Sequence, residues 1–181
     1  APADQRFEQG LAKLITTLGR IFLPPTFIVL AIYAATIPAN FWRPFQERDV
    51  LIVFNVLLFA VMALLIAATP LSTESTVGEG GYARYAHWAM IGVELLTALI
   101  SVYALSATLY RTALAGLTMN RMTIVGWNSI NIALLCVMLY RRARHGEASW
   151  VRDTQRTFSL GMILYAGWAL FVVLATPWLF R

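Results

Sequence analysis

Charged side chains are scarce in this sequence, and their scarcity is the first constraint on its class. They make up 13% of the 181 residues, whereas 59% of the residues are hydrophobic. A soluble domain contains about 25% charged and about 45–50% apolar residues. The composition therefore excludes a soluble enzyme, a soluble nucleic-acid-binding domain and a disordered protein. It indicates an integral membrane protein that crosses the bilayer several times.

Cysteine and lysine are nearly absent as well. The single cysteine, Cys136, excludes an internal disulfide and a cysteine pair for a metal or redox site. Thirteen of the fourteen basic residues are arginine, a bias typical of GC-rich bacterial genomes. The net charge of +5 is spread over short connections, whereas a nucleic-acid-binding protein gathers its basic residues on one face. We expect no nucleic-acid partner, and arginines that contact lipid headgroups.

Several motifs of catalytic proteins are also missing. The sequence has no glycine-rich phosphate loop, no G-x-S-x-G elbow and no H-E-x-x-H motif. It has no pair of intramembrane acids that could hold a metal or act as general acid and base. The sequence therefore does not favour an enzyme.

Long hydrophobic runs are what the sequence does contain. A helix needs about 20 mostly apolar residues to cross a bilayer. Five runs approach this length, and they are continuous rather than alternating, which favours helices over strands. We expect an all-α membrane protein, a bundle of five transmembrane helices. The predicted spans are residues 21–39, 51–69, 88–110, 124–140 and 158–180.

Residues 1–20 form a separate segment before the first predicted span. They show no signal-peptide pattern of a charged region followed by an apolar core. Their apolar residues recur at helical spacing, which predicts an N-terminal amphipathic helix on the membrane surface or, alternatively, against a partner subunit. The expected division is an interfacial helix over 1–20 and a transmembrane domain over 21–181. The apolar stripe consists of Phe7, Leu11, Leu14, Ile15, Leu18 and Phe22.

The distribution of Lys and Arg predicts the orientation. With five spans, the N-terminal segment, the second loop and the fourth loop lie on one side and carry nine basic residues, against five on the other side. Basic residues are enriched in cytoplasmic loops. We therefore expect a multi-pass protein of a bacterial cell membrane with a cytoplasmic N-terminus.

Glu94 is the acid that lies well inside a predicted span. A charge in hydrocarbon is costly, so such a residue faces other protein groups and finds partners. Thr97, Ser101 and Thr108 continue its face at helical spacing. Two interpretations stay open: a proton or ion path, and a protonated or hydrogen-bonded glutamate that holds helices together.

Asparagines form the second intramembrane polar group. Asn128 and Asn131 are three residues apart and share a face of the fourth span. Asn55 enters the second span at a depth comparable with Asn128, and Asn131 lies nearer the midplane, as Ser101 does. The group is either an interhelical hydrogen-bond cluster or a substrate site.

Two histidines and one loop complete the candidates. His87 and His145 are expected in or beside loops, so they are weak candidates for haem or pigment ligands, which generally lie within the bundle, and no cofactor is expected. In the third connection, Thr118 or Asn120 is expected to cap the fourth span and Arg121 to anchor it at headgroups. Ligand binding by this loop is the alternative.

The same region carries a family resemblance. The residues Gly116-Leu117-Thr118, Asn120-Arg121 and Gly126-Trp127-Asn128 resemble the C-terminal part of an uncharacterised family of bacterial multi-pass membrane proteins, a domain of unknown function. In that family a G-L-T-x-x-R stretch opens a late helix, and proline often stands at the position of Met119. The resemblance covers the third to fifth spans. It implies a multi-pass helical fold and a truncated or split relative, and it transfers no activity.

The sequence thus predicts a non-catalytic integral membrane protein, a subunit or scaffold of a larger membrane complex. One alternative is a transporter or channel component that uses Glu94 and the intramembrane asparagines. Another is a pigment- or haem-binding subunit of an electron-transfer complex that uses His87 or His145.

Overall fold

Every regular element of the described chain is helical. The computed structural model describes residues 2–69, 80–145 and 150–179. Five of its helices are long and apolar enough to cross a membrane, which confirms the expected all-α membrane fold. The short elements η1 (Pro38–Asn40) and α2 (Arg43–Gln46) connect the first two long helices. The long helices are α1 (Pro2–Thr36), α3 (Arg48–Ala68), α4 (Gly80–Ala115), α5 (Met119–His145) and α6 (Trp150–Leu179).

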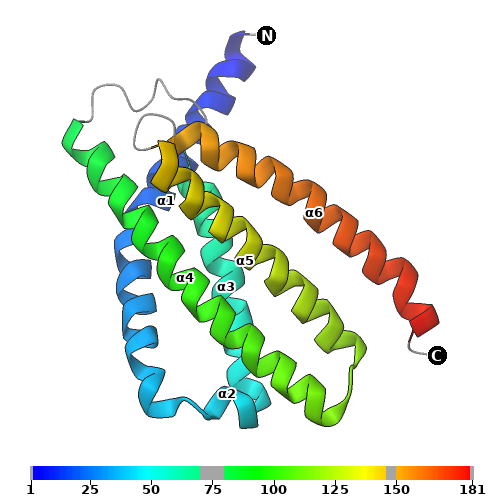
Figure 1. The fold of residues 1–181 in the computed structure, drawn as a ribbon. Helices are drawn as coiled ribbons and strands as arrows, with labels where there is room; N and C mark the ends of the chain where they lie inside the picture. The colour runs from blue at the N-terminus through cyan, green and yellow to red at the C-terminus, as the bar shows by residue number, and fades with distance from the viewer. Residues whose placement is uncertain (1, 70–79, 146–149, 180–181) are drawn as a thin grey trace.

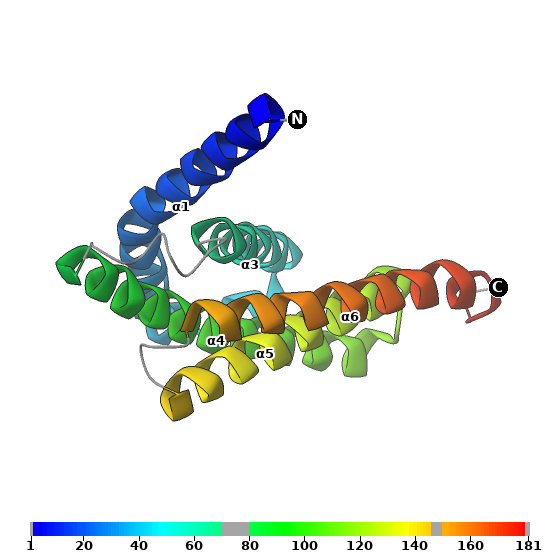
Figure 2. The same ribbon diagram turned by 90° about the horizontal axis from the view of Figure 1, so that it is seen from above.

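α4 is the central helix of the bundle. It packs against α1, α3 and α5, and half of the residues in its most apolar stretch are buried. α6 lies outermost and packs mainly along α5, so that only 6% of the residues in its most apolar stretch are buried (Figures 1 and 2). α2, the start of α3, the end of α4 and the start of α5 meet at one end of the bundle, called here the α2 end.

α1 runs without a break from the predicted surface segment into the first span. It changes direction about midway along its length (Figure 1). Pro24 and Pro25 lie inside this helix and remove backbone hydrogen bonds, which is a common cause of a bend. The helix continues through residue 20, where the sequence placed a boundary, and the stretch long and apolar enough to cross a membrane begins at Thr17. The side chain of Phe7 lies outside the described residues, and the other members of the stripe are exposed, which leaves them available to lipid or to a partner: Leu11, Leu14, Ile15, Leu18 and Phe22.

Close helix contacts depend on small residues. A Cβ on Gly19 would lie 2.7 Å from the backbone nitrogen of Ala68, so α1 and α3 cross here at backbone distance. A Cβ on Gly126 would overlap the ring of Trp168, and one on Gly161 would lie 2.8 Å from Leu134. Because lipid is as apolar as these side chains, such close packing is what holds membrane helices together.

The connections before and after α5 are shorter than those predicted from the apolar runs of the sequence. α5 continues past Tyr140 to His145, and α6 begins at Trp150 rather than near residue 158. Only residues 116–118 separate α4 from α5, and Gly116 allows this turn with a φ of +80°. Polar residues that the sequence suggested were loops therefore lie on helices.

Candidate functional site

Glu94 of α4 and Arg142 of α5 form a buried ion pair. Arg142 Nη2 donates to Glu94 Oε1 over 2.6 Å, and 3% and 0% of the two side chains are exposed. An ion removed from water costs several kcal/mol unless it is paired and hydrogen-bonded. Each residue therefore supplies the charge that the other needs in order to stay inside the bundle.

Further groups of α4 and α6 surround the arginine. Arg142 Nη2 also lies 3.3 Å from Thr154 Oγ1, and Arg142 Nη1 lies 3.4 Å from His87 Nδ1. The guanidinium carbon lies 5.2 Å from the ring centre of Trp150, a distance at which a cation is attracted to the aromatic face. These contacts join α4, α5 and the start of α6 at the end of the bundle opposite α2.

The polar face of α4 is buried as a whole. Thr97 and Thr108 donate to backbone carbonyls four residues earlier, while Ser101 Oγ is buried without a hydrogen-bond partner among the described residues. Glu94 Oε2 is likewise buried without a hydrogen-bond partner among the described residues. Buried polar atoms without partners are rare, so these two oxygens need an explanation.

Sequence reasoning missed Arg142, Thr154 and Trp150 because it ended the fourth span at Tyr140 and placed the next residues in a basic loop. The signal that could have found Arg142 is Glu94 itself, since an intramembrane acid needs a basic partner at similar depth. Arg142 lies two residues beyond the predicted span end.

The asparagines make two separate interhelical contacts. Asn128 Nδ2 donates to Asn55 Oδ1 over 2.7 Å, which links α5 to α3 at the depth that the sequence suggested. Asn131 accepts a hydrogen bond from the Tyr165 hydroxyl of α6, not from Ser101. Tyr165 also stacks on Trp127, with ring centres 4.8 Å apart. The predicted cluster is thus divided between two sides of α5.

The loop candidates line a cavity at the α2 end of the bundle. Its volume is about 230 Å³, and Thr118, Asn120 and Arg121 contribute to its wall together with Asn55. Thr118 Oγ1 accepts from the backbone N–H of Arg121 over 3.4 Å, so Thr118 is the residue that caps α5. Arg121 Nη1 donates to the carbonyl of Gly116 at the end of α4.

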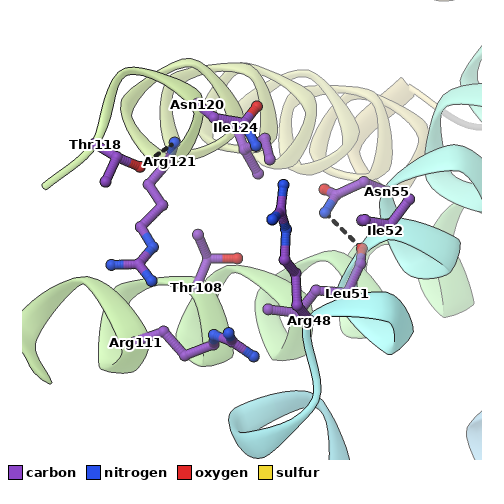
Figure 3. A pocket seen from close by; sticks show the side chains of 10 residues that line it. All are labelled: Arg48, Leu51, Ile52, Asn55, Thr108, Arg111, Thr118, Asn120, Arg121 and Ile124. Carbon is purple, nitrogen blue, oxygen red and sulfur yellow. Dashed lines mark hydrogen bonds between the residues drawn. The ribbon is translucent and has the colours of Figure 1, made fainter. Parts of the chain in front are cut away.

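Two further arginines, Arg48 of α3 and Arg111 of α4, line the same cavity. Figure 3 shows Arg48 and Arg121 extending into the space between the helices, with Arg111 on the α4 side. Arg111 Nη1 donates to the carbonyl of Gln46 over 3.1 Å. No acidic side chain is among the residues that line the cavity.

The histidine candidates differ in their surroundings. His87 lies inside α4 and is buried beside Arg142 and Trp150, because α4 begins at Gly80 and not after the histidine. The side chain of His145 lies outside the described residues. Within the described part of the chain, no group of three or more His, Cys, Asp or Glu could hold a metal ion.

Comparisons with known proteins found no family model, no curated protein and no solved structure that matches this chain.

Proposed function

We propose that this protein is a non-catalytic integral membrane subunit of a larger membrane assembly. The observation that carries the proposal is the position of α6, which lies at the edge of the bundle and is supported mainly by α5. Only 6% of the residues in its most apolar stretch are buried within the chain. A helix held on one side offers most of its surface to a neighbour.

The outward face of α6 also contains small residues. A Cβ added at Gly167 would meet no atom within 4 Å, so this glycine serves no contact within the described chain. Ala166 and Ala169 are exposed beside it. Small residues on a membrane helix let a second helix approach closely, so this face suits a protein neighbour as well as lipid.

The Glu94–Arg142 pair supports the non-catalytic part of the proposal. The acid that could have served transport is neutralised by an arginine from the next helix, and both side chains are almost fully buried. A pair in this position fixes the register of α4 against α5. Such a role in conformational specificity is known for some buried polar groups.

The proposed location is a bacterial cell membrane, with lipid and other membrane subunits as partners and the N-terminus in the cytoplasm. The support is the excess of basic residues on the N-terminal side. Arg142 belongs to that excess but is buried with Glu94, so eight basic residues remain on this side against five.

The test is extraction of the tagged chain from its native membrane in a mild detergent, with particle size, absorbance spectrum and co-purifying chains measured together. We expect a particle that contains other membrane proteins in fixed ratio. Purification of the chain alone, or only as a homo-oligomer, would overturn the proposal.

A matched pair of glycine variants locates the contact. Gly167→Leu adds bulk to the outward face of α6, and Gly10→Leu adds the same bulk to α1, where a Cβ also meets nothing within 4 Å. We expect Gly167→Leu to release the partner proteins while Gly10→Leu retains them. Equal retention by both variants would place the contact elsewhere than on α6.

A transporter or channel component is the second candidate, and one observation favours it. Glu94 Oε2 and Ser101 Oγ lie two helical turns apart on α4, both buried and both without a hydrogen-bond partner among the described residues. Such atoms suit a proton path. If this function holds, Glu94→Gln abolishes proton-coupled flux in liposomes while the protein still folds. Unchanged flux in this variant would exclude Glu94 as a proton carrier.

A further inference from the structure

The arginine cavity at the α2 end gathers positive charge without an acidic counterpart. Arg48, Arg111 and Arg121 come from three different helices and line one cavity of about 230 Å³. Arg111 and Arg121 each donate one hydrogen bond to a backbone carbonyl. No ion pair joins any of these arginines to an acid in the described part of the chain.

Three guanidinium groups around one cavity repel one another, so an anion placed among them would be stabilised by all three. Arginine is the side chain best suited to phosphate, because its planar donors can bind two oxygens at once. The amino-terminal end of α5 borders the same cavity through Asn120, and its helix dipole adds partial positive charge.

An apolar groove continues from this cavity between α3 and α5. Its volume is about 280 Å³, and Asn55 and Ile124 line both the groove and the arginine cavity. Val56, Phe59 and Trp127 form most of the apolar wall. The site therefore has a cationic end, the arginine cavity, and an apolar end, the groove, which adjoin each other.

The depth of the two ends matches that of a lipid. Arg48 is the first residue of α3, and Arg111 and Arg121 lie within a few residues of the ends of α4 and α5. Aromatic residues gather at the same end, where Phe45 lies 5.5 Å from Tyr110 between ring centres. Aromatic rings and helix ends mark the headgroup level of a bilayer. Val56 and Phe59 follow further along α3, toward the apolar middle of the span.

We propose that the arginine cavity and the adjoining groove together bind one molecule of an anionic phospholipid. The phosphate of the headgroup lies among Arg48, Arg111 and Arg121, and an acyl chain lies along Val56, Phe59 and Trp127. The combined shape argues for a lipid over a free anion, because inorganic phosphate would use the cavity and leave the groove without a function.

The experiment is a binding titration of the purified full chain by native mass spectrometry. The probes are dioleoylphosphatidylglycerol, dioleoylphosphatidylcholine and inorganic phosphate. We expect the phosphatidylglycerol to bind about tenfold more tightly than the zwitterionic lipid, since the latter brings a cation to the arginines. Equal affinity for the two lipids would overturn the proposal.

Two pairs of variants test the two ends separately. Arg48→Gln removes a lining charge that has no partner in the described chain, and Arg43→Gln removes a charge from α2 at the same end of the bundle but outside the cavity. Val56→Trp fills the groove, and Val53→Trp adds the same bulk to α3 outside it. We expect Arg48→Gln and Val56→Trp each to weaken phosphatidylglycerol binding about tenfold, and both controls to bind as the unmodified chain does.

The remaining outcomes are decisive as well. If inorganic phosphate binds as tightly as phosphatidylglycerol and Val56→Trp has no effect, the ligand is a free anion and the lipid proposal fails. If Arg48→Gln does not fold, Arg48→Lys keeps the charge without the planar fork, and we expect it to weaken binding measurably. Binding equal to that of the unmodified chain in both Arg48→Lys and Val56→Trp would also overturn the proposal.

Discussion

Arg142 of α5 and Glu94 of α4 lie 2.6 Å apart between Nη2 and Oε1, and almost no part of either side chain is exposed. Each would be costly to bury alone, and together they join two helices that are also the most extensively packed neighbours in the bundle. His87, Thr154 and Trp150 complete the surroundings of the arginine, so the start of α6 depends on the same pair.

The two halves of this pair are expected to differ in their tolerance of mutation. Glu94→Leu leaves a buried guanidinium, which stays charged, and we expect it to lower the free energy of unfolding by about 3–5 kcal/mol. Arg142→Leu should cost less, because a carboxylate left alone can become neutral by taking up a proton. Reversible unfolding in mixed micelles with increasing SDS measures both.

The double variant supplies the control. With Glu94→Leu and Arg142→Leu combined, no unpaired charge remains, so we expect a smaller loss of stability than the sum of the single losses. Strictly additive losses would contradict the assignment of a coupled pair.

The Asn55–Asn128 hydrogen bond is expected to contribute modestly. Interhelical hydrogen bonds in membrane proteins are worth about 0.6 kcal/mol on average, with values up to about 1.7 kcal/mol. We expect a coupling energy in that range from the cycle of Asn55→Ala and Asn128→Ala. Ser129→Ala is the control, because Ser129 donates only to the Val125 carbonyl of its own helix. A coupling between Ser129 and Asn55 as large as that of Asn128 would contradict this contact.

Substitution of Gly19 is expected to destabilise the protein more than substitution of Gly10. A Cβ at position 19 would meet the α3 backbone at 2.7–2.9 Å, and backbone atoms cannot turn away as a side chain can. We expect Gly19→Ala to destabilise the protein by about 1–3 kcal/mol, as overpacking typically does. Gly10→Ala meets nothing within 4 Å, so it should be neutral or stabilising by up to about 1 kcal/mol through helix propensity. Thermal unfolding in detergent compares the two variants.

The proposed orientation makes a labelling prediction. In a Cys136→Ala background, Asn40→Cys places an exposed thiol in η1, and Arg144→Cys places one near the end of α5 on the opposite side. With a cytoplasmic N-terminus, a membrane-impermeant maleimide should label position 40 in intact cells, and position 144 only after the membrane is opened. The reverse pattern would show that the N-terminus is outside.

The sequence alone determined the number and the helical nature of the spans. These properties are local, because a long apolar run must satisfy its own backbone hydrogen bonds in lipid, and only a helix does so within one segment. It also placed Glu94, Thr97 and Ser101 on one protected face, since helical periodicity and the cost of an intramembrane charge require it.

The tertiary structure decided which groups meet. Arg142 became the partner of Glu94 because α5 continues as a helix beyond its apolar run, where hydropathy cannot mark its end. Arg48 lies far from Arg111 and Arg121 in the chain, and the three were expected to contact headgroups separately. Three helix ends bring them around one cavity. Such encounters depend on helix crossing and depth, which backbone packing at residues such as Gly19 sets and which no single segment encodes.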